Sequence, residues 1–295
     1  MLNYKIAIAS GKGGTGKTTV SLNLFYTLQK SLDQKIQLVD CDVEEPNIKL
    51  FTKGELKSKS DVNIKIPVID KDKCVYCGDC AAACSYNAIL FVKSISHIAV
   101  LEDLCHGCGV CSYVCNQPNV IIEKDKKLGE VNTYKLENAN ELVEGKIEIG
   151  SALAVPVIAK TLNSTDDKAL RIIDAPPGTS CPVMETIKDV DYTVLVTEPT
   201  PFGLNDLKLM VETMRKMKGR FGVVINRAGL GDKAIYEYLK NENIPLLMEI
   251  PFDKNLARIY SEGKIMVDEV PEINHKYLQL FENIKFNLNE PNYHR

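Results

Sequence analysis

YKIAIASGKGGTGKTT, residues 4–19, begins with a short apolar strand and continues into a glycine-rich loop. The residues from Gly11 to Thr18 match the pattern G-x-x-x-x-G-K-[ST] at every position. This match stands between an expected strand and an expected helix at about residues 18–32, which is the context that a phosphate-binding loop requires. We therefore expect backbone N–H groups and the N-terminus of the helix to face nucleotide phosphates.

The polar side chains of this loop have separate expected roles. Lys17 is expected to bind the β- and γ-phosphates, and the hydroxyl of Thr18 is expected to bind Mg²⁺. A plain glycine turn is the alternative, which the full match and its context disfavour. Lys12 is a second lysine that the general pattern does not require. The loop residues expected to bind ATP are Gly11, Gly13, Gly14, Thr15, Gly16, Lys17, Thr18 and Thr19.

Strand and helix patterns alternate along most of the chain. Residues 35–39 are expected to form a second strand that ends at Asp40, and the polar, lysine-rich residues 51–61 are expected to form a linker. Further strands are expected at 169–173, 193–196, 221–225 and 246–250, with helices at 152–162, 203–217, 232–241 and 273–285. This order predicts an α/β fold with a doubly wound, mostly parallel sheet. We expect residues 1–55 and 136–295 to form this discontinuous domain, with an inserted α+β domain at 56–135.

The insert contains the cysteine pattern C-x₂-C-x₂-C-x₃-C twice, the second copy displaced by 31 residues. The two copies are Cys74, Cys77, Cys80 and Cys84, and Cys105, Cys108, Cys111 and Cys115. Such compact groups of four thiolates are typical of [4Fe–4S] clusters. Structural zinc is the alternative, but zinc usually takes two cysteines from each of two separated turns.

The spacing resembles that of bacterial ferredoxins with two [4Fe–4S] clusters. In those ferredoxins the fourth ligand of each cluster comes from the other motif. The resemblance implies two clusters per chain, one held by Cys74, Cys77, Cys80 and Cys115, the other by Cys105, Cys108, Cys111 and Cys84. The chain departs from the ferredoxin pattern at Ser85 and Asn116, where a proline usually follows the fourth cysteine.

The segment KGGTGKT, residues 12–18, resembles the deviant Walker A loop of the MinD/ParA/Mrp/nitrogenase iron protein superfamily. In that superfamily the extra lysine reaches the ATP of a partner subunit. The resemblance implies that Lys12 binds the partner's phosphates and couples ATP to dimerisation. A solvated loop lysine is the alternative.

Residues at later strand ends extend this resemblance. Asp42 is implied to orient or activate the attacking water, and Asp40 to support Mg²⁺. Asp174, in the stretch IIDAPPGT, is implied to bind Mg²⁺, the N–H of Gly178 to sense the γ-phosphate, and Asn226 to contact adenine. Helix caps or turns are the alternatives for these Asp and Asn residues. The residues expected to act in hydrolysis are Lys12, Lys17, Asp42 and Asp174.

The combined motifs resemble MinD-superfamily ATPases with an inserted ferredoxin domain, including the ATPases of the orange-protein complex. This resemblance implies slow, partner-stimulated ATP hydrolysis coupled to electron transfer through the clusters. It also implies a homodimer, or a heterodimer with a paralogue, that works with redox donor and acceptor proteins. One alternative is an iron–sulfur or metal-cofactor assembly ATPase of the Mrp type. Another is a regulatory or positioning switch like MinD and ParA.

Composition and the remaining motifs narrow these classes. The formal charge of −3 gives no reason to expect nucleic-acid binding, and no apolar run approaches the length of a membrane span. We find no signal peptide pattern and expect a cytoplasmic protein, in which ten cysteines favour ligand roles over disulfides. Cys41 is expected to pack in the core, and Cys181 either packs, faces a partner or bridges a dimer through a shared cluster. His106 either is solvated or tunes a cluster potential.

Overall fold

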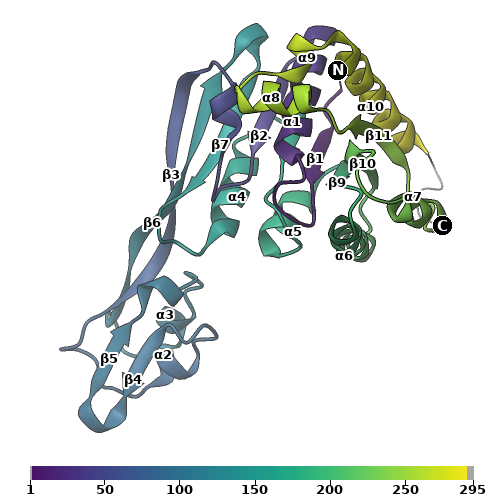
Figure 1. Cartoon of the computed structure of the whole chain (residues 1–295). Helices are drawn as coiled ribbons and strands as arrows, with labels where there is room; N and C mark the ends of the chain where they lie inside the picture. The colour runs from purple at the N-terminus through teal and green to yellow at the C-terminus, as the bar shows by residue number, and fades with distance from the viewer. Residues whose placement is uncertain (1, 291–295) are drawn as a thin grey trace.

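The computed structural model describes residues 2–290, which are organised around one nine-stranded sheet (Figure 1). Its strands follow the order β11 (Leu246–Pro251), β10 (Phe221–Ala228), β9 (Tyr192–Thr197), β1 (Lys5–Ala9), β8 (Leu170–Asp174), β2 (Ile36–Asp40), β7 (Glu141–Ile147), β6 (Ile121–Lys135) and β3 (Glu55–Ile69). From β11 to β7 every neighbouring pair is parallel, whereas β6 and β3 are antiparallel to their neighbours. The predicted mostly parallel α/β sheet is therefore confirmed.

Helices cover both faces of this sheet because alternate strand residues point to opposite sides. Ile6 and Ile8 of β1 belong to one apolar core, and Ala7 and Ala9 belong to the other. The first core contains residues of α1 (Lys17–Ser31), α8 (Lys254–Ser261), α9 (Met266–Glu269) and α10 (Pro271–Asn289). The second contains residues of α4 (Ala154–Asn163), α5 (Cys181–Ile187), α6 (Pro201–Met217) and α7 (Ala234–Asn241). This double covering is the doubly wound arrangement that the sequence predicts.

Strands β3 and β6 form a long two-stranded ribbon, and this corrects the expectation of a linker at 51–61. Residues 55–69 pair with 121–135 over the full length of both strands. Residues 55–61 are exposed on both faces, so burial leaves no period-two pattern in the sequence. Backbone pairing and cross-strand ion pairs, such as Lys59 to Glu130 at 2.7 Å, hold this part of the ribbon instead. The expected domain boundaries at 55/56 and 135/136 lie where the ribbon joins the main sheet.

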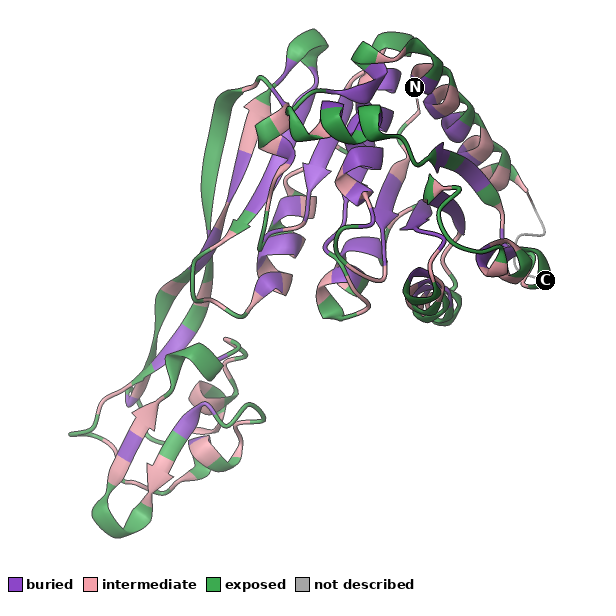
Figure 2. Ribbon diagram, in the orientation of Figure 1, coloured by how far each residue is buried: buried purple, intermediate pink, exposed green. Residues whose placement is uncertain are grey.

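The far end of the ribbon carries a small unit that we call the cysteine module, residues 70–120. It contains α2 (Asp79–Ala82), the antiparallel pair β4 (Ile89–Val92) and β5 (His97–Val100), and α3 (Val110–Val114). Four 3₁₀ helices complete the described elements: η1 (Ile48–Phe51), η2 (Lys93–Ile95), η3 (Glu102–Leu104) and η4 (Glu137–Ala139). Figures 1 and 2 show the module projecting away from the main sheet, with exposed and half-buried residues dominating its surface. Within residues 2–290, no helix is both long and apolar enough to cross a membrane.

Candidate functional site

The glycine-rich loop lies at the carboxyl edge of the parallel strands, between the end of β1 and the start of α1. Gly14 and Gly16 have left-handed backbone angles, with φ of 77° and 97°. A Cβ atom on Gly16 would lie 2.4 Å from Nδ2 of Asn226, and one on Gly11 would lie 2.5 Å from the carbonyl oxygen of Asp206. These glycines are therefore required by conformation or packing, and the loop backbone stays open toward the adjoining pocket.

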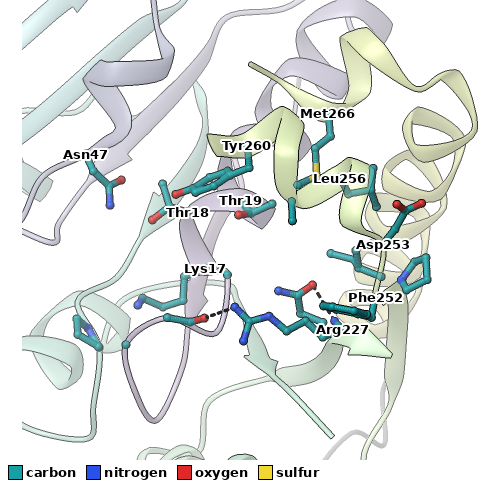
Figure 3. Close-up of a pocket in the computed structure, with 18 of the residues that line it drawn as sticks. Lys17, Thr18, Thr19, Asn47, Arg227, Phe252, Asp253, Leu256, Tyr260 and Met266 are labelled. Carbon is teal, nitrogen blue, oxygen red and sulfur yellow. Dashed lines mark hydrogen bonds between the residues drawn. The ribbon is translucent and has the colours of Figure 1, made fainter. Parts of the chain in front are cut away.

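A pocket of about 460 Å³ opens beside this loop (Figure 3). One wall consists of loop residues together with Asp42 and Asn226, which the sequence analysis had singled out. The opposite wall comes from the end of β11 and from α8 and α9, and includes Phe252, Tyr260 and Met266. Sequence reasoning missed this wall because no motif marks it. Its one available signal is the amphipathic segment 254–261, which directly follows an apolar strand.

Lys17 and Thr18 line the pocket, and Asp174 lies behind them in contact with Thr18. The Thr18 hydroxyl donates to Oδ2 of Asp174 at 2.7 Å, and the Ser21 hydroxyl donates to Oδ1 at 2.9 Å. Lys17 is 6% exposed, and its ammonium makes no hydrogen bond or ion pair with any residue in the described part of the chain. Burial raises the pKa of Asp174, against the opposing charge of Lys17. A buried ammonium beside a hydroxyl–carboxylate pair fits a phosphate chain with Mg²⁺.

Asp40 and Asp42 occupy different environments although they are two residues apart. The carboxylate of buried Asp40 accepts backbone N–H groups from Asp42 at 3.1 Å, and from Asn47 and Ile48 at 3.2 Å each. Asp40 therefore shapes the loop after β2, and its role toward Mg²⁺ stays a prediction. Asp42 is half-buried in the pocket wall, where burial raises its pKa to about 6 despite the charge of Lys17.

Gly178 and Asn226 both contact the phosphate loop or its preceding strand. The N–H of Gly178 donates to the carbonyl of Ser10 at 3.0 Å, so this amide already has a partner. Asn226 donates from Nδ2 to the carbonyl of Thr15 at 2.8 Å and also lines the pocket. Asn226 therefore braces the loop, and its contact with adenine and the sensing role of Gly178 stay predictions.

Lys12 is held by a residue that the sequence analysis did not identify. Its Nζ lies 2.7 Å from Oε1 of Glu198, whose Oε2 lies 2.8 Å from Nη1 of Arg227. Burial alone would raise the pKa of Glu198, but Lys12 and Arg227 outweigh it and lower the pKa. Arg227 lines the pocket, so Glu198 links Lys12 to the nucleotide site within one chain. A buried strand that ends directly before a glutamate, β9, is the signal that could have found it.

The second cysteine group, the predicted ligand set that combines Cys84 with three cysteines of the second motif, lines a common cavity. Cys84, Cys105, Cys108 and Cys111 line one cavity, so the structure brings together the cross-motif set implied by the ferredoxin resemblance. The backbone N–H of Ala88 donates to the sulfur of Cys84 at 3.3 Å. Cys108 is exposed, which leaves this cavity near the protein surface.

The first cysteine group is the predicted ligand set Cys74, Cys77, Cys80 and Cys115. The structure brings this set together only in part. Cys80 is buried beside Cys74, and burial raises the pKa of the Cys80 thiol, with a further contribution from the thiols of Cys74, Cys77 and Cys111. The thiol of Cys115 donates to the carbonyl of Gln117 at 3.6 Å. Over residues 2–290, no three His, Cys, Asp or Glu side chains converge closely enough to hold a single metal ion.

The backbone repeats between the two motifs. Tyr76 and Gly107 occupy equivalent positions and have φ of 52° and 68°, and the equivalent Gly78 and Gly109 have φ of 89° and 74°. A Cβ atom on Gly78 would lie 2.6 Å from the ring of Phe91. Both motifs therefore place left-handed residues at the same two positions, in agreement with a sequence duplication.

Residues 6–267 match the family described as the CobQ/CobB/MinD/ParA nucleotide binding domain. The chain belongs to this family. The match spans the phosphate loop and the pocket wall at α8, so the pocket described above lies within the matched nucleotide binding domain. Proteins of this MinD/ParA type generally hydrolyse ATP.

Individual relatives extend over nearly the whole chain. An uncharacterized protein of Methanocaldococcus jannaschii is 32% identical over 262 residues, covering 88% of this chain and 90% of the relative. A cytosolic Fe-S cluster assembly factor Nubp2 homolog of Anopheles gambiae is 24% identical, covering 92% and 91%. The solved cell division ATPase MinD of Pyrococcus furiosus is 21% identical with a TM-score of 0.57, covering 97% and 99%, which supports the fold.

Three candidate residues of this MinD/ParA-type protein belong neither to the nucleotide pocket lining nor to the predicted cluster ligands. Cys41 is fully buried among apolar residues of the second core, in agreement with the packing role expected for it. Cys181 is exposed at the first turn of α5. His106 is exposed and stacks on Tyr86, with ring centroids 3.7 Å apart. His106 therefore lines the cysteine cavity as part of an aromatic pair.

Proposed function

We propose that the chain is an ATP-hydrolysing iron–sulfur protein that couples nucleotide-dependent dimerisation to electron transfer through two [4Fe–4S] clusters. The observation that carries this proposal is the cavity lined by Cys84, Cys105, Cys108 and Cys111. These cysteines come from both motifs and surround a space. Each iron of a cubane cluster takes one thiolate, so four cysteines distributed around a cavity suit a cluster better than a single zinc ion.

Further features of the cysteine module support cluster binding. The N–H of Tyr76 donates to the sulfur of Cys74 at 3.4 Å, and the N–H of Ala88 donates to that of Cys84. Such hydrogen bonds to sulfur stabilise thiolates and tune cluster potentials. The order β3, α2, β4, β5, α3, β6 is that of a duplicated β-α-β unit, in agreement with an inserted α+β ferredoxin-like domain. When bound, the clusters would supply one-electron transfer.

The arrangement of the nucleotide site supports a role in hydrolysis. Lys17 would hold the β- and γ-phosphates, while Thr18 and Asp174 would hold Mg²⁺ directly or through water, with Asp40 in support. Asp42 would accept the proton of the attacking water. The oxygen of that water would bond to the γ-phosphorus as ADP departs with the bridging oxygen. Bound Mg²⁺ would neutralise charge on the phosphate oxygens.

The rate of ATP hydrolysis is expected to fall as the pH drops through about 6. The pKa of Asp42 is raised to about 6, so the carboxylate that accepts the proton predominates only above that pH. Single-turnover hydrolysis should therefore be about tenfold slower at about pH 5 than at about pH 7.5. Asp42→Asn should be slow at every pH in this range. An Asp42→Asn protein that keeps the wild-type rate and inflection would remove Asp42 from this role.

Dimerisation is the second part of the proposal. Lys12 would leave Glu198 and bind the phosphates of a second subunit, either another copy or a paralogue. The ribbon of β3 and β6 starts at residue 55, soon after Asp40 and Asp42, so the loop that shapes the nucleotide site leads directly to the cysteine module. Redox donor and acceptor proteins would dock on that module.

An anaerobic EPR redox titration of the reconstituted protein, with and without MgATP, tests the proposal. Two [4Fe–4S] clusters should appear, with about eight iron atoms per chain, and MgATP should change their potential or spectrum. Clusters that are reducible yet indifferent to MgATP would contradict the coupling. A protein that binds no iron would overturn the redox function as a whole.

Iron–sulfur cluster assembly is a second candidate because the names of two relatives point to it. One is the Nubp2 homolog described above, and the other is an iron-sulfur cluster carrier protein of Methanocaldococcus jannaschii, which is 24% identical. Against this candidate, no cysteine follows Cys181 in the sequence, and four thiolates per cluster favour retention over release. Cluster transfer to an apo-acceptor protein, measured against redox-dye reduction, separates the two functions.

A further inference from the structure

The short helix η1 contacts the wall of the nucleotide pocket. The ring of Phe51, at its last position, stacks on Tyr260 with centroids 4.8 Å apart and planes 29° apart. Tyr260 lines the pocket, and burial raises the pKa of its hydroxyl. Figure 3 shows Tyr260 beside Thr18 and Thr19 at the edge of the pocket. A nucleotide that moves Tyr260 would therefore move Phe51.

The same helix contacts the ribbon that carries the cysteine module. Nζ of Lys49 lies 5.1 Å from the ring centroid of Tyr134, which belongs to β6. Lys49 also donates to the carbonyl of Thr52 at 3.1 Å. The Tyr134 hydroxyl donates to Oε1 of buried Glu144 on β7 at 3.4 Å. Lys49 therefore connects η1 to the ribbon at Tyr134.

The beginning of η1 is fixed to the phosphate end of the nucleotide site. Asp40 accepts the N–H groups of Asn47 and Ile48, and its own pKa is raised by burial and by the nearby charge of Asp174. Phe51 and Tyr134 both pack against the core formed around α1. One four-residue helix therefore contacts the Mg²⁺ side of the site, its tyrosine wall and the ribbon.

The ribbon in turn is tied to the residues beside the cysteines. Lys124 pairs with Glu102 at 2.9 Å and Lys126 pairs with Asp103 at 2.7 Å, both partners lying just before Cys105. On the other strand, buried Ile66 packs with Cys105. A shift of β6 against the main sheet would therefore reach the second cysteine group.

We infer that η1 is the regulatory relay between the nucleotide site and the cysteine module. In this relay Phe51 moves with Tyr260, and Lys49 transmits the movement to Tyr134 on β6. This inference rests on the proposed function in one respect, namely that the module is the part that nucleotide controls. Packed elements with two arrangements transmit such changes, because dense cores do not deform continuously.

Hydrogen exchange of the full-length chain, with and without an Mg²⁺-bound non-hydrolysable ATP analogue, tests the relay. In the wild type the analogue should change exchange in peptides covering 121–135 by about fivefold, the lower range of allosteric coupling. Phe51→Leu and Lys49→Gln should bind the analogue as the wild type does, because neither residue lines the pocket, and should lose this response. Leu50→Ala is the matched control, since Leu50 belongs to η1 but is 80% exposed. All samples are compared at the same oligomeric state.

Two results would overturn the relay. One is a wild type that binds the analogue with no response at 121–135, and the other is a full response in both Phe51→Leu and Lys49→Gln. Iron analysis of the same samples separates this inference from the proposed function. A response lost in both variants of a protein without clusters would support the relay and refute the redox function. Intact clusters with a response that ignores both variants would refute the relay alone.

Discussion

Lys12→Ala is expected to bind ATP as the wild type does and to lose ATP-dependent dimerisation and hydrolysis. The pocket is built from Lys17 and its neighbours, whereas Lys12 lies outside the pocket lining and pairs with Glu198. In the proposed dimer, Lys12 and the phosphates of the second subunit form a buried charge pair. Removing one partner of such a pair costs about 2 kcal/mol or more, so the dimer should weaken at least about 30-fold. A symmetric dimer contains this contact twice, which increases the loss. ATP affinity by calorimetry and dimer mass by light scattering measure the two effects separately.

Glu198→Gln is the companion variant for this prediction. The Lys12–Glu198 pair must break before Lys12 can reach a second subunit, and the Lys12 side chain is 33% exposed. Partly exposed ion pairs are worth up to about 1 kcal/mol, so freeing Lys12 should strengthen the ATP-dependent dimer by up to about fivefold. Arg227→Gln controls for the other partner of Glu198. If Lys12→Ala dimerises normally, Lys12 acts only within its own chain and the trans role is wrong.

The second large effect concerns cross-ligation, which paired cysteine variants can test directly. Cys84→Ser together with Cys108→Ser should remove one cluster and leave about four iron atoms per chain. Cys84→Ser together with Cys77→Ser should remove both clusters. The reason is that Cys84 and Cys108 line the same cavity, while Cys77 lies beside Cys80 in the other group. Iron and sulfide analysis with EPR of the remaining cluster provides the measurement.

Ligation within each motif predicts the reverse pattern. In that case Cys84→Ser with Cys77→Ser would leave about four iron atoms, and Cys84→Ser with Cys108→Ser would leave none. Cys181→Ser is the control, because Cys181 is exposed on α5 and lies outside the cysteine module. Zinc in place of iron in the wild-type protein would exclude both patterns.

The phosphate loop and the parallel sheet could be predicted because each depends on consecutive residues. The residues from Gly11 to Thr18 supply both the glycines that permit the loop conformation and the lysine that the loop needs. Apolar runs indicate buried parallel strands directly. The ribbon could not be predicted in the same way. Its residues 55–61 are exposed on both faces, so they resemble a polar linker until β6 pairs with them.

No local sequence pattern predicted the contacts between residues that are far apart in the chain. Glu198 is 186 positions from Lys12, and Tyr260 meets Phe51 across more than two-thirds of the sequence. Gly178 shows the same limit, since its N–H faces the Ser10 carbonyl in the structure. Local patterns indicate which backbone conformations and which ligand types a segment supplies. The sequence by itself therefore determined the phosphate loop, the mostly parallel α/β fold class and the cysteine spacing. Only the tertiary structure decided which side chains meet Lys12, Tyr260 and Tyr134, because those contacts arise when separate elements pack on one core.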